Sequence, residues 1–291
     1  MGLQMEENNE KAMSLLKAKK MDSENPMGLE TTSLPQYKIH ALPSKFLGYP
    51  QGTIITYTPI TLDELELLNS DEEIEPELAI ARLLDAIQCN TLPAEKLYYW
   101  DVMYIGVKRK LLAFGDTTGM AYGKCPKCGH WVPKQFKHTD LEFKELQVPA
   151  LPMRMTINGK ELQFKPVTVE GFLSMQSGMG DLGVYASMIQ NMPFEEAFEF
   201  VKNTYGVDML KFRFMDNQLD YGLKPFEVKC NNQVQVANPK FDNTQPQGPD
   251  NQPTITKLCG TKTEVEVTSP FEVVFPKDAI VGGNDFEVQY G

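Results

Sequence analysis

The chain has 291 residues, of which 42% are hydrophobic, enough for one large domain or two small ones. Its 28 basic and 39 acidic side chains give a net charge of −11 and a pI near 4.9, which opposes overall binding to a nucleic-acid backbone. No run of about 18 or more apolar residues occurs, so the sequence predicts no membrane-spanning helix.

The N-terminal 36 residues are predicted to form an extended arm. Residues 1–36 are polar and carry few apolar side chains that could anchor them to a core. A segment of this kind gains its order from a partner, so we expect it to contact other subunits of an assembly.

Residues 37–122 are predicted to form a domain of strands and helices. The β-branched and aromatic residues at 53–58 predict a strand, which Pro59 ends. Thr61 and Glu64 stand at capping-box spacing, and this spacing predicts the start of a helix.

Two amphipathic helices follow in this domain. The first begins near Pro76, because proline suits the first turn of a helix, and Cys89 falls on its apolar side. A cysteine there is expected to be a small buried hydrophobic residue and not a ligand. The second helix is predicted over 95–112 and contains Asp101 and Arg109, which could act in catalysis or form an ion pair. Exposure on the solvent-facing side of the helix is more common for such residues, so we expect both to be exposed.

A pair of cysteines separated by two residues is the strongest chemical signal in the sequence. Cys125 and Cys128 precede Gly129, which can adopt the positive φ of a tight metal-binding knuckle. One knuckle supplies two of the four ligands of a closed zinc site, and Cys230 and Cys259 can supply the other two. Cys259 also precedes a glycine, although 28 residues separate the distant pair. These four cysteines predict a structural zinc ion in a zinc ribbon whose second knuckle is opened by an insertion.

Several other uses of the cysteines remain open. A redox dithiol would open a helix, whereas the segment at 131–134 contains a proline and is predicted to be extended. A disulfide framework is typical of small secreted domains, and the sequence shows no signal peptide. A zinc deaminase would need a His-x-Glu motif upstream, and none is present. His130 or His138 could replace a distant cysteine as a ligand, and the thiols could be free of metal.

The rest of the sequence predicts an α+β fold. Asn158-Gly159 predicts a two-residue hairpin turn, and this hairpin and the first zinc knuckle form a region at 123–165. A helical region follows at 166–222. Residues 223–291 contain the second half of the zinc ribbon, a polar loop insertion at 231–256 and C-terminal strands. We therefore expect a small β/α N-terminal part, a zinc-ribbon-like β region and an inserted helical region.

The order of these motifs resembles that of a known family. The motifs span roughly residues 40 to 275 and are Leu42-Pro43-Ser44, Gly48-Tyr49-Pro50, the helix from Asp101 to Arg109, the Cys-x-x-Cys knuckle and the later cysteine pair. In this order they resemble the hub-associated baseplate proteins of T-even-like contractile-tailed bacteriophages. The resemblance implies a structural protein of the virion, assembled in the host cytoplasm into the tail baseplate. It also implies other baseplate and tail proteins as partners, in a symmetric assembly of many copies.

The sequence predicts that the protein is not an enzyme. It has three histidines and lacks a glycine-rich phosphate loop, a nucleophile elbow and a His-Glu-x-x-His motif, so we expect no small-molecule substrate. One alternative to a structural subunit is a baseplate assembly factor that is absent from the mature particle. The other is a zinc-ribbon module that binds nucleic acid, which the acidic chain opposes. Four lysines around the knuckle favour this second alternative: Lys124, Lys127, Lys134 and Lys137.

Overall fold

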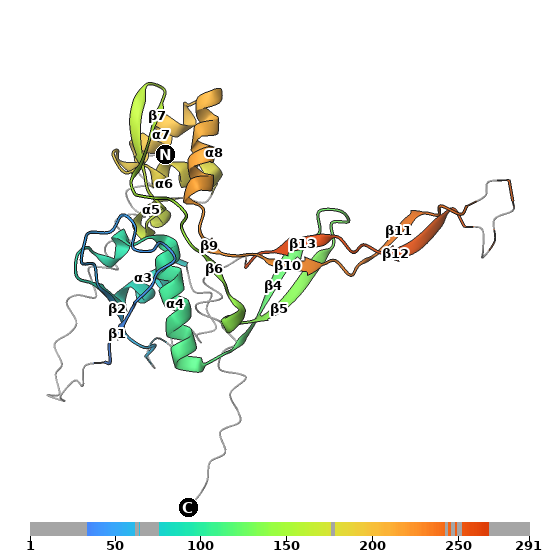
Figure 1. The fold of residues 1–291 in the computed structure, drawn as a ribbon, viewed down its shortest axis with the longest axis horizontal. Coiled ribbons are helices and arrows are strands. Elements are labelled where there is room, and N and C mark those ends of the chain that lie inside the picture. Colours follow the sequence, from blue (N-terminus) through green and yellow to red (C-terminus); the bar gives the residue numbers. More distant parts are fainter. Residues whose placement is uncertain are drawn as a thin grey trace, which may run out of the picture. The chain divides into compact units, whose positions relative to one another are not determined.

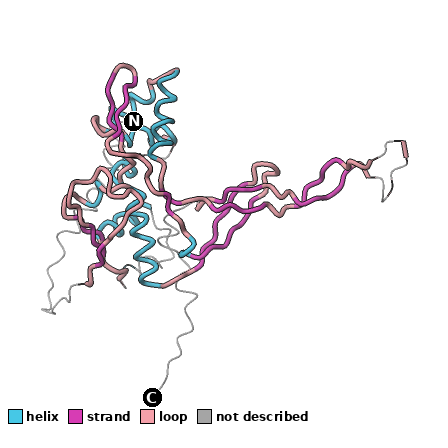
Figure 2. The backbone as a smooth tube through the Cα atoms, viewed as in Figure 1, coloured by secondary structure: helices cyan, strands magenta, loops and turns pink. Residues whose placement is uncertain are grey.

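The computed structural model describes residues 34–61, 64, 76–175, 178–241, 244–245, 248 and 252–267. Its helices and antiparallel sheets confirm a mixed α+β fold (Figure 1 and Figure 2). The described residues divide into two compact units, each built from two stretches of chain: 34–115 with 143–222, and 116–142 with 223–267. Residues 1–33 of the predicted arm and the C-terminal strands predicted beyond Val267 lie outside the described residues.

A three-stranded antiparallel sheet begins the first unit. β1 (Tyr37–Lys38), β2 (Ile55–Tyr57) and β3 (Ile87–Cys89) lie in the order β1-β2-β3, which confirms a strand within the range predicted from β-branched and aromatic residues. Cys89 pairs with Ile55 across β2 and β3 and is half-buried. The prediction that Cys89 lies on a helix is therefore wrong, because the helix before it ends at Asp85 and the chain becomes extended.

The capping box at Thr61 and Glu64 and the helix start at Pro76 are confirmed, whereas the rest of the helix predicted after Thr61 lies outside the described residues. The N–H of Glu64 donates to Thr61 Oγ1 at 3.3 Å, and the N–H of Thr61 donates to Glu64 Oε2 at 3.1 Å, which is the reciprocal pattern of a capping box. α3 (Pro76–Asp85) begins at the predicted proline. Proline is tolerated there because the first N–H groups of a helix have no partner within it.

The long helix α4 (Tyr99–Phe114) begins at Tyr99 and not at residue 95 as predicted. A 3-10 turn, η1 (Ala94–Lys96), precedes it. Between the two, Tyr98 is extended and forms a β-bridge with Thr168. This pairing with a distant segment interrupts the helical pattern, and a local reading of periodicity cannot detect it.

A hairpin and four helices complete the first unit. β7 (Met153–Ile157) and β8 (Lys160–Phe164) pair across Asn158 and Gly159, whose φ angles of 49° and 75° suit the predicted two-residue turn. Phe164 and Phe212 are fully buried in the core that the hairpin shares with the helices. The predicted helical region is confirmed. Its elements are α5 (Val169–Ser174), α6 (Gly180–Met188), α7 (Phe194–Lys202) and α8 (Val207–Leu219). The short strand β6 (Phe143–Lys144) pairs with β9 (Gly222–Leu223), which spans the boundary between the two units.

Asp101 lies on the buried side of α4, so the prediction that it faces solvent is wrong. Its exposed fraction is 0%, and its carboxylate accepts hydrogen bonds from the Ser44 N–H at 3.1 Å and the Tyr49 hydroxyl at 2.8 Å. Burial raises the pKa of the Asp101 carboxyl to about 6. The residue anchors the 44–49 segment to α4, which is a structural role.

Arg109 is also buried, with an exposed fraction of 1%, and the same prediction is wrong for it. Its guanidinium donates to the carbonyl oxygens of Thr58 at 2.7 Å and Pro59 at 3.2 Å, and it pairs with Glu64 at 2.9 Å. The planar fork of arginine can satisfy several acceptors at once, which is why it can be buried at this position. Arg109 therefore ties α4 to the end of the first sheet.

Candidate metal centre

The first pair of cysteines lies in the turn of a hairpin in the second unit. β4 (Thr118–Lys124) and β5 (Trp131–Lys137) pair so that Lys124 lies opposite Trp131. Within the turn, the Gly129 N–H donates to the Cys125 carbonyl at 2.9 Å, and Gly129 has a φ of 70°. The tight turn predicted for this cysteine pair is therefore present, with glycine at the position that needs left-handed backbone.

The second pair of cysteines is brought together by two antiparallel strand pairs that follow each other along one ribbon. β10 (Phe226–Lys229) pairs with β13 (Lys262–Val265), and β11 (Gln233–Ala237) pairs with β12 (Thr254–Leu258). Cys230 and Cys259 lie between these pairs, and the Gly260 N–H donates to the Cys230 carbonyl at 2.9 Å. Near both ends of the 28 residues that separate the two cysteines, the chain is paired as β11 and β12.

The prediction of a loop throughout 231–256 is thus wrong at both ends of that range. All of β11 and the first three residues of β12 fall within it. Alternating valines in β11 and the threonines and Ile255 in β12 are favourable in strands, but the asparagine, glutamine and proline content of the whole range obscures this local pattern.

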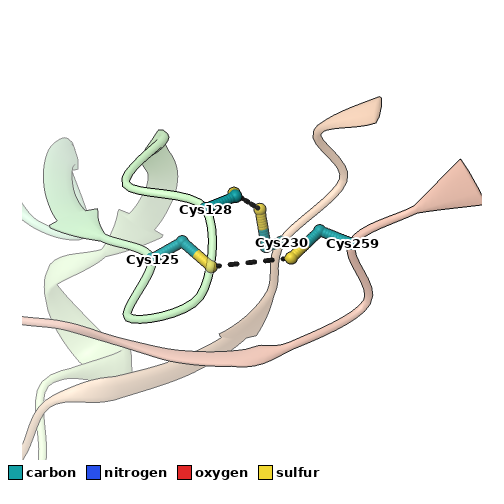
Figure 3. Close-up of side chains that lie close together, drawn as sticks. All are labelled: Cys125, Cys128, Cys230 and Cys259. Atoms are coloured by element: carbon teal, nitrogen blue, oxygen red, sulfur yellow. Dashed lines mark hydrogen bonds between the residues drawn. The ribbon is translucent and has the colours of Figure 1, made fainter. Parts of the chain in front are cut away.

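The four predicted ligands converge on one point (Figure 3). All four Sγ atoms lie within 4.8 Å of one another, with 3.7 Å between Cys125 and Cys259 and 3.6 Å between Cys128 and Cys230. A disulfide would need a separation of about 2.05 Å. A tetrahedral zinc ion with bonds of about 2.3 Å to sulfur places its ligands about 3.8 Å apart, so the arrangement fits a four-sulfur metal site.

The surroundings of the sulfurs favour thiolates at some positions and a cation beside them. Hydrogen bonding from the backbone of Cys128 lowers the pKa of Cys125 to about 6, and the Thr261 hydroxyl lowers the pKa of Cys259. Burial raises the pKa of Cys230 to about 12, because a buried thiolate without a countercharge is unfavourable. A divalent cation among the four sulfurs would supply that countercharge and hold all four as thiolates.

The β4–β5 hairpin packs closely against the β10–β13 pair, and this packing holds the two cysteine pairs near each other. A Cβ atom at Gly123 would lie 2.3 Å from the Glu264 carbonyl oxygen and 2.9 Å from Val265 Cα, so only glycine fits at this contact between β4 and β13. The rings of Phe136 and Phe226 stack with centroids 5.2 Å apart. Neither contact could be predicted from the sequence, because nothing local identifies which glycine meets a neighbouring strand.

Sequence reasoning also missed polar residues around the sulfurs. Asn232 Nδ2 lies 3.7 Å from Cys128 Sγ, and the Thr261 hydroxyl lies 3.3 Å from Cys259 Sγ. Both residues are two positions from a cysteine, and this proximity was the signal that could have identified them. Such contacts orient metal ligands and adjust their basicity.

His130 and His138, the two alternative ligands, do not belong to the cluster, and neither does Cys89. His130 is exposed, and its carbonyl accepts from the Cys125 N–H at 2.8 Å. His138 is buried with its Nδ1 against the carbonyl oxygen of Thr117, at 2.6 Å. Among the residues with described positions, the four cysteines form the only group of three or more His, Cys, Asp or Glu side chains that could hold a metal ion.

A site with four sulfur ligands leaves no position for water or substrate on a tetrahedral ion. The arrangement can therefore bind a metal and hold three chain segments together. None of the helices in the described ranges has the length and apolar character needed to span a bilayer.

Comparisons with known proteins give no further guide: no family model matches the chain, and no curated protein or solved structure is significantly similar to it.

Proposed function

We propose that this protein is a zinc-stabilised structural subunit of a multiprotein assembly, specifically of a contractile phage tail baseplate. Zinc is the natural occupant of the four-cysteine cluster, because tetrahedral sulfur coordination is typical of structural zinc sites. The phage assignment comes from the ordered motifs at 42–52, 101–109, 125–130, 230 and 259. In this role the protein makes contacts with other subunits and performs no catalysis.

The observation that carries the assembly role is a row of exposed apolar side chains on α8. Val207, Leu210 and Phe214 recur at intervals of three and four residues, with exposed fractions of 75%, 63% and 50%. Phe212, Met215 and Leu219 form the buried side of the same helix. A helix that is apolar on both sides is typical of a protein with a partner against its outer side.

Purified tail particles of the encoding phage test this proposal. We expect mass spectrometry to find the chain in mature particles, and we expect the double variant Leu210→Asp/Phe214→Asp to be lost from them while its circular dichroism stays unchanged. Gln190→Asp, which adds a charge at an exposed polar position of the same unit, should be retained. Presence only in precursor particles would favour the assembly factor, and absence from all particles would contradict the proposal.

A second candidate function is the binding of single-stranded nucleic acid, and one observation favours it. Tyr122 and Trp131 are 49% and 59% exposed, and they lie on the same side of the β4–β5 hairpin as Lys124. Exposed aromatic rings beside lysines are typical of proteins that bind single-stranded nucleic acid. Quenching of tryptophan fluorescence by a single-stranded oligonucleotide, weakened by salt and by Tyr122→Ala, would support this function. No affinity at low salt would exclude it.

A further inference from the structure

The β11–β12 hairpin has no hydrophobic core of its own. Neither strand has a buried side chain, and only three side chains are half-buried: Val234, Val236 and Ile255. No third strand joins this pair within the described part of the chain. Isolated two-stranded ribbons are marginally stable in water, so a further pairing partner would stabilise this one.

The base of the hairpin is fixed beside the cysteine cluster. The Cys259 N–H donates to the Asn232 carbonyl at 2.8 Å, and Cys230 immediately precedes this segment. At the other end, the Asn238 N–H donates to the Pro253 carbonyl at 2.9 Å. The hairpin is therefore held at its base and free along its sides.

The register identifies which groups face outward. The pairs Asn232–Cys259 and Asn238–Pro253 are hydrogen-bonded, and hydrogen-bonded positions recur at every second residue of an antiparallel pair. Positions 234 and 236 therefore bond to β12. The N–H and C=O groups of Gln233, Gln235 and Ala237 point away from β12 and form an open edge.

This edge lacks the features that prevent strands from pairing. β11 contains no charged residue and no proline, whereas β12 carries Lys257. The sequence Gln-Val-Gln-Val-Ala is also self-complementary in antiparallel pairing. With Gln235 opposite its own copy, Val234 lies opposite Val236, and both valines stay on the face that carries Ile255.

We propose that the open edge of β11 pairs with β11 of a second copy of this chain, in an antiparallel register centred on Gln235. The two hairpins then form a four-stranded sheet in the order β12-β11-β11-β12. Its central strands carry a continuous apolar strip from both copies. This pairing does not depend on the phage assignment or on the α8 surface, so its failure would leave both of those proposals untouched.

Light scattering with size exclusion tests the pairing on the full metal-loaded chain. We expect a mass of twice the 32.9 kDa of one chain at micromolar concentrations. Gln235→Pro removes an outward N–H and should give a monomer that retains its metal. Thr256→Pro is the matched control, because the Thr256 N–H faces the opposite edge, and it should remain a dimer.

Charge variants at the two-fold axis test the register itself. Gln235→Lys and Gln235→Glu each place like charges opposite each other, so each should weaken dimerisation by up to about fivefold. An equimolar mixture of the two should regain the dimer, because opposite charges then meet. The proposal would be overturned by a monomeric native chain, by a dimeric Gln235→Pro variant, or by a mixture that dimerises no better than either charge variant alone. A monomeric native chain would instead favour pairing of this edge with a strand from another protein.

Discussion

Replacing Cys125 or Cys128 with serine is expected to reduce the metal content from about one zinc ion per chain to none and to unfold the second unit. The reason is that a metal site absent from the unfolded chain contributes its binding free energy to folding, about 10–16 kcal/mol for zinc-finger peptides near pH 7. The few buried apolar residues of this unit, among them Ala121, Val132 and Phe136, cannot replace a contribution of that size.

The measurement combines elemental analysis with tryptophan fluorescence. The chain has two tryptophans, of which Trp131 lies in the second unit and Trp100 in the first, so a Trp100→Phe background reports on the second unit alone. Cys89→Ser is the matched control, because Cys89 is a half-buried thiol outside the cluster. Full zinc retention in Cys125→Ser/Cys128→Ser would contradict the proposed ligand set.

Arg109→Ala is expected to destabilise the first unit by about 3–5 kcal/mol, since removing one partner leaves a buried charge without compensation. The change deprives Glu64, whose side chain is 13% exposed, of its ion pair, and it leaves the carbonyl oxygens of Thr58 and Pro59 without their donor. Arg109→Lys should lose somewhat less, because lysine keeps the charge without the planar fork.

Urea unfolding of a Trp131→Phe background, followed through Trp100, measures this loss. Arg154→Ala is the control: Arg154 pairs with Glu161 at 3.6 Å with both side chains more than 60% exposed, and it should cost less than about 1 kcal/mol. Equal losses for Arg109→Ala and Arg154→Ala would show that the Arg109 pair adds nothing to the stability of the fold.

Local chemistry made several features predictable from the sequence. Gly129 follows a cysteine pair, Thr61 and Glu64 have capping-box spacing, and Asn158-Gly159 has the residues that a two-residue turn requires. Each of these signals acts within a few residues. The distant cysteines could also be predicted, because a closed zinc site needs four ligands and the chain offers few others.

The features that could not be predicted depend on contacts between distant segments. Asp101 and Arg109 are buried because the segments around Ser44 and Thr58 supply their hydrogen-bond partners, 57 and 51 residues away. Helix periodicity does not contain that information. Likewise, the strands within 231–256 pair with each other between Cys230 and Cys259, and the polar composition of that range hides their strand pattern.

X-ray absorption at the zinc edge of the purified protein counts the atoms that bind the metal and identifies their elements. We expect about one zinc ion per chain with four sulfur neighbours at about 2.3 Å. A first shell containing nitrogen at about 2.0 Å, or a chain purified without bound zinc, would contradict the four-cysteine zinc site.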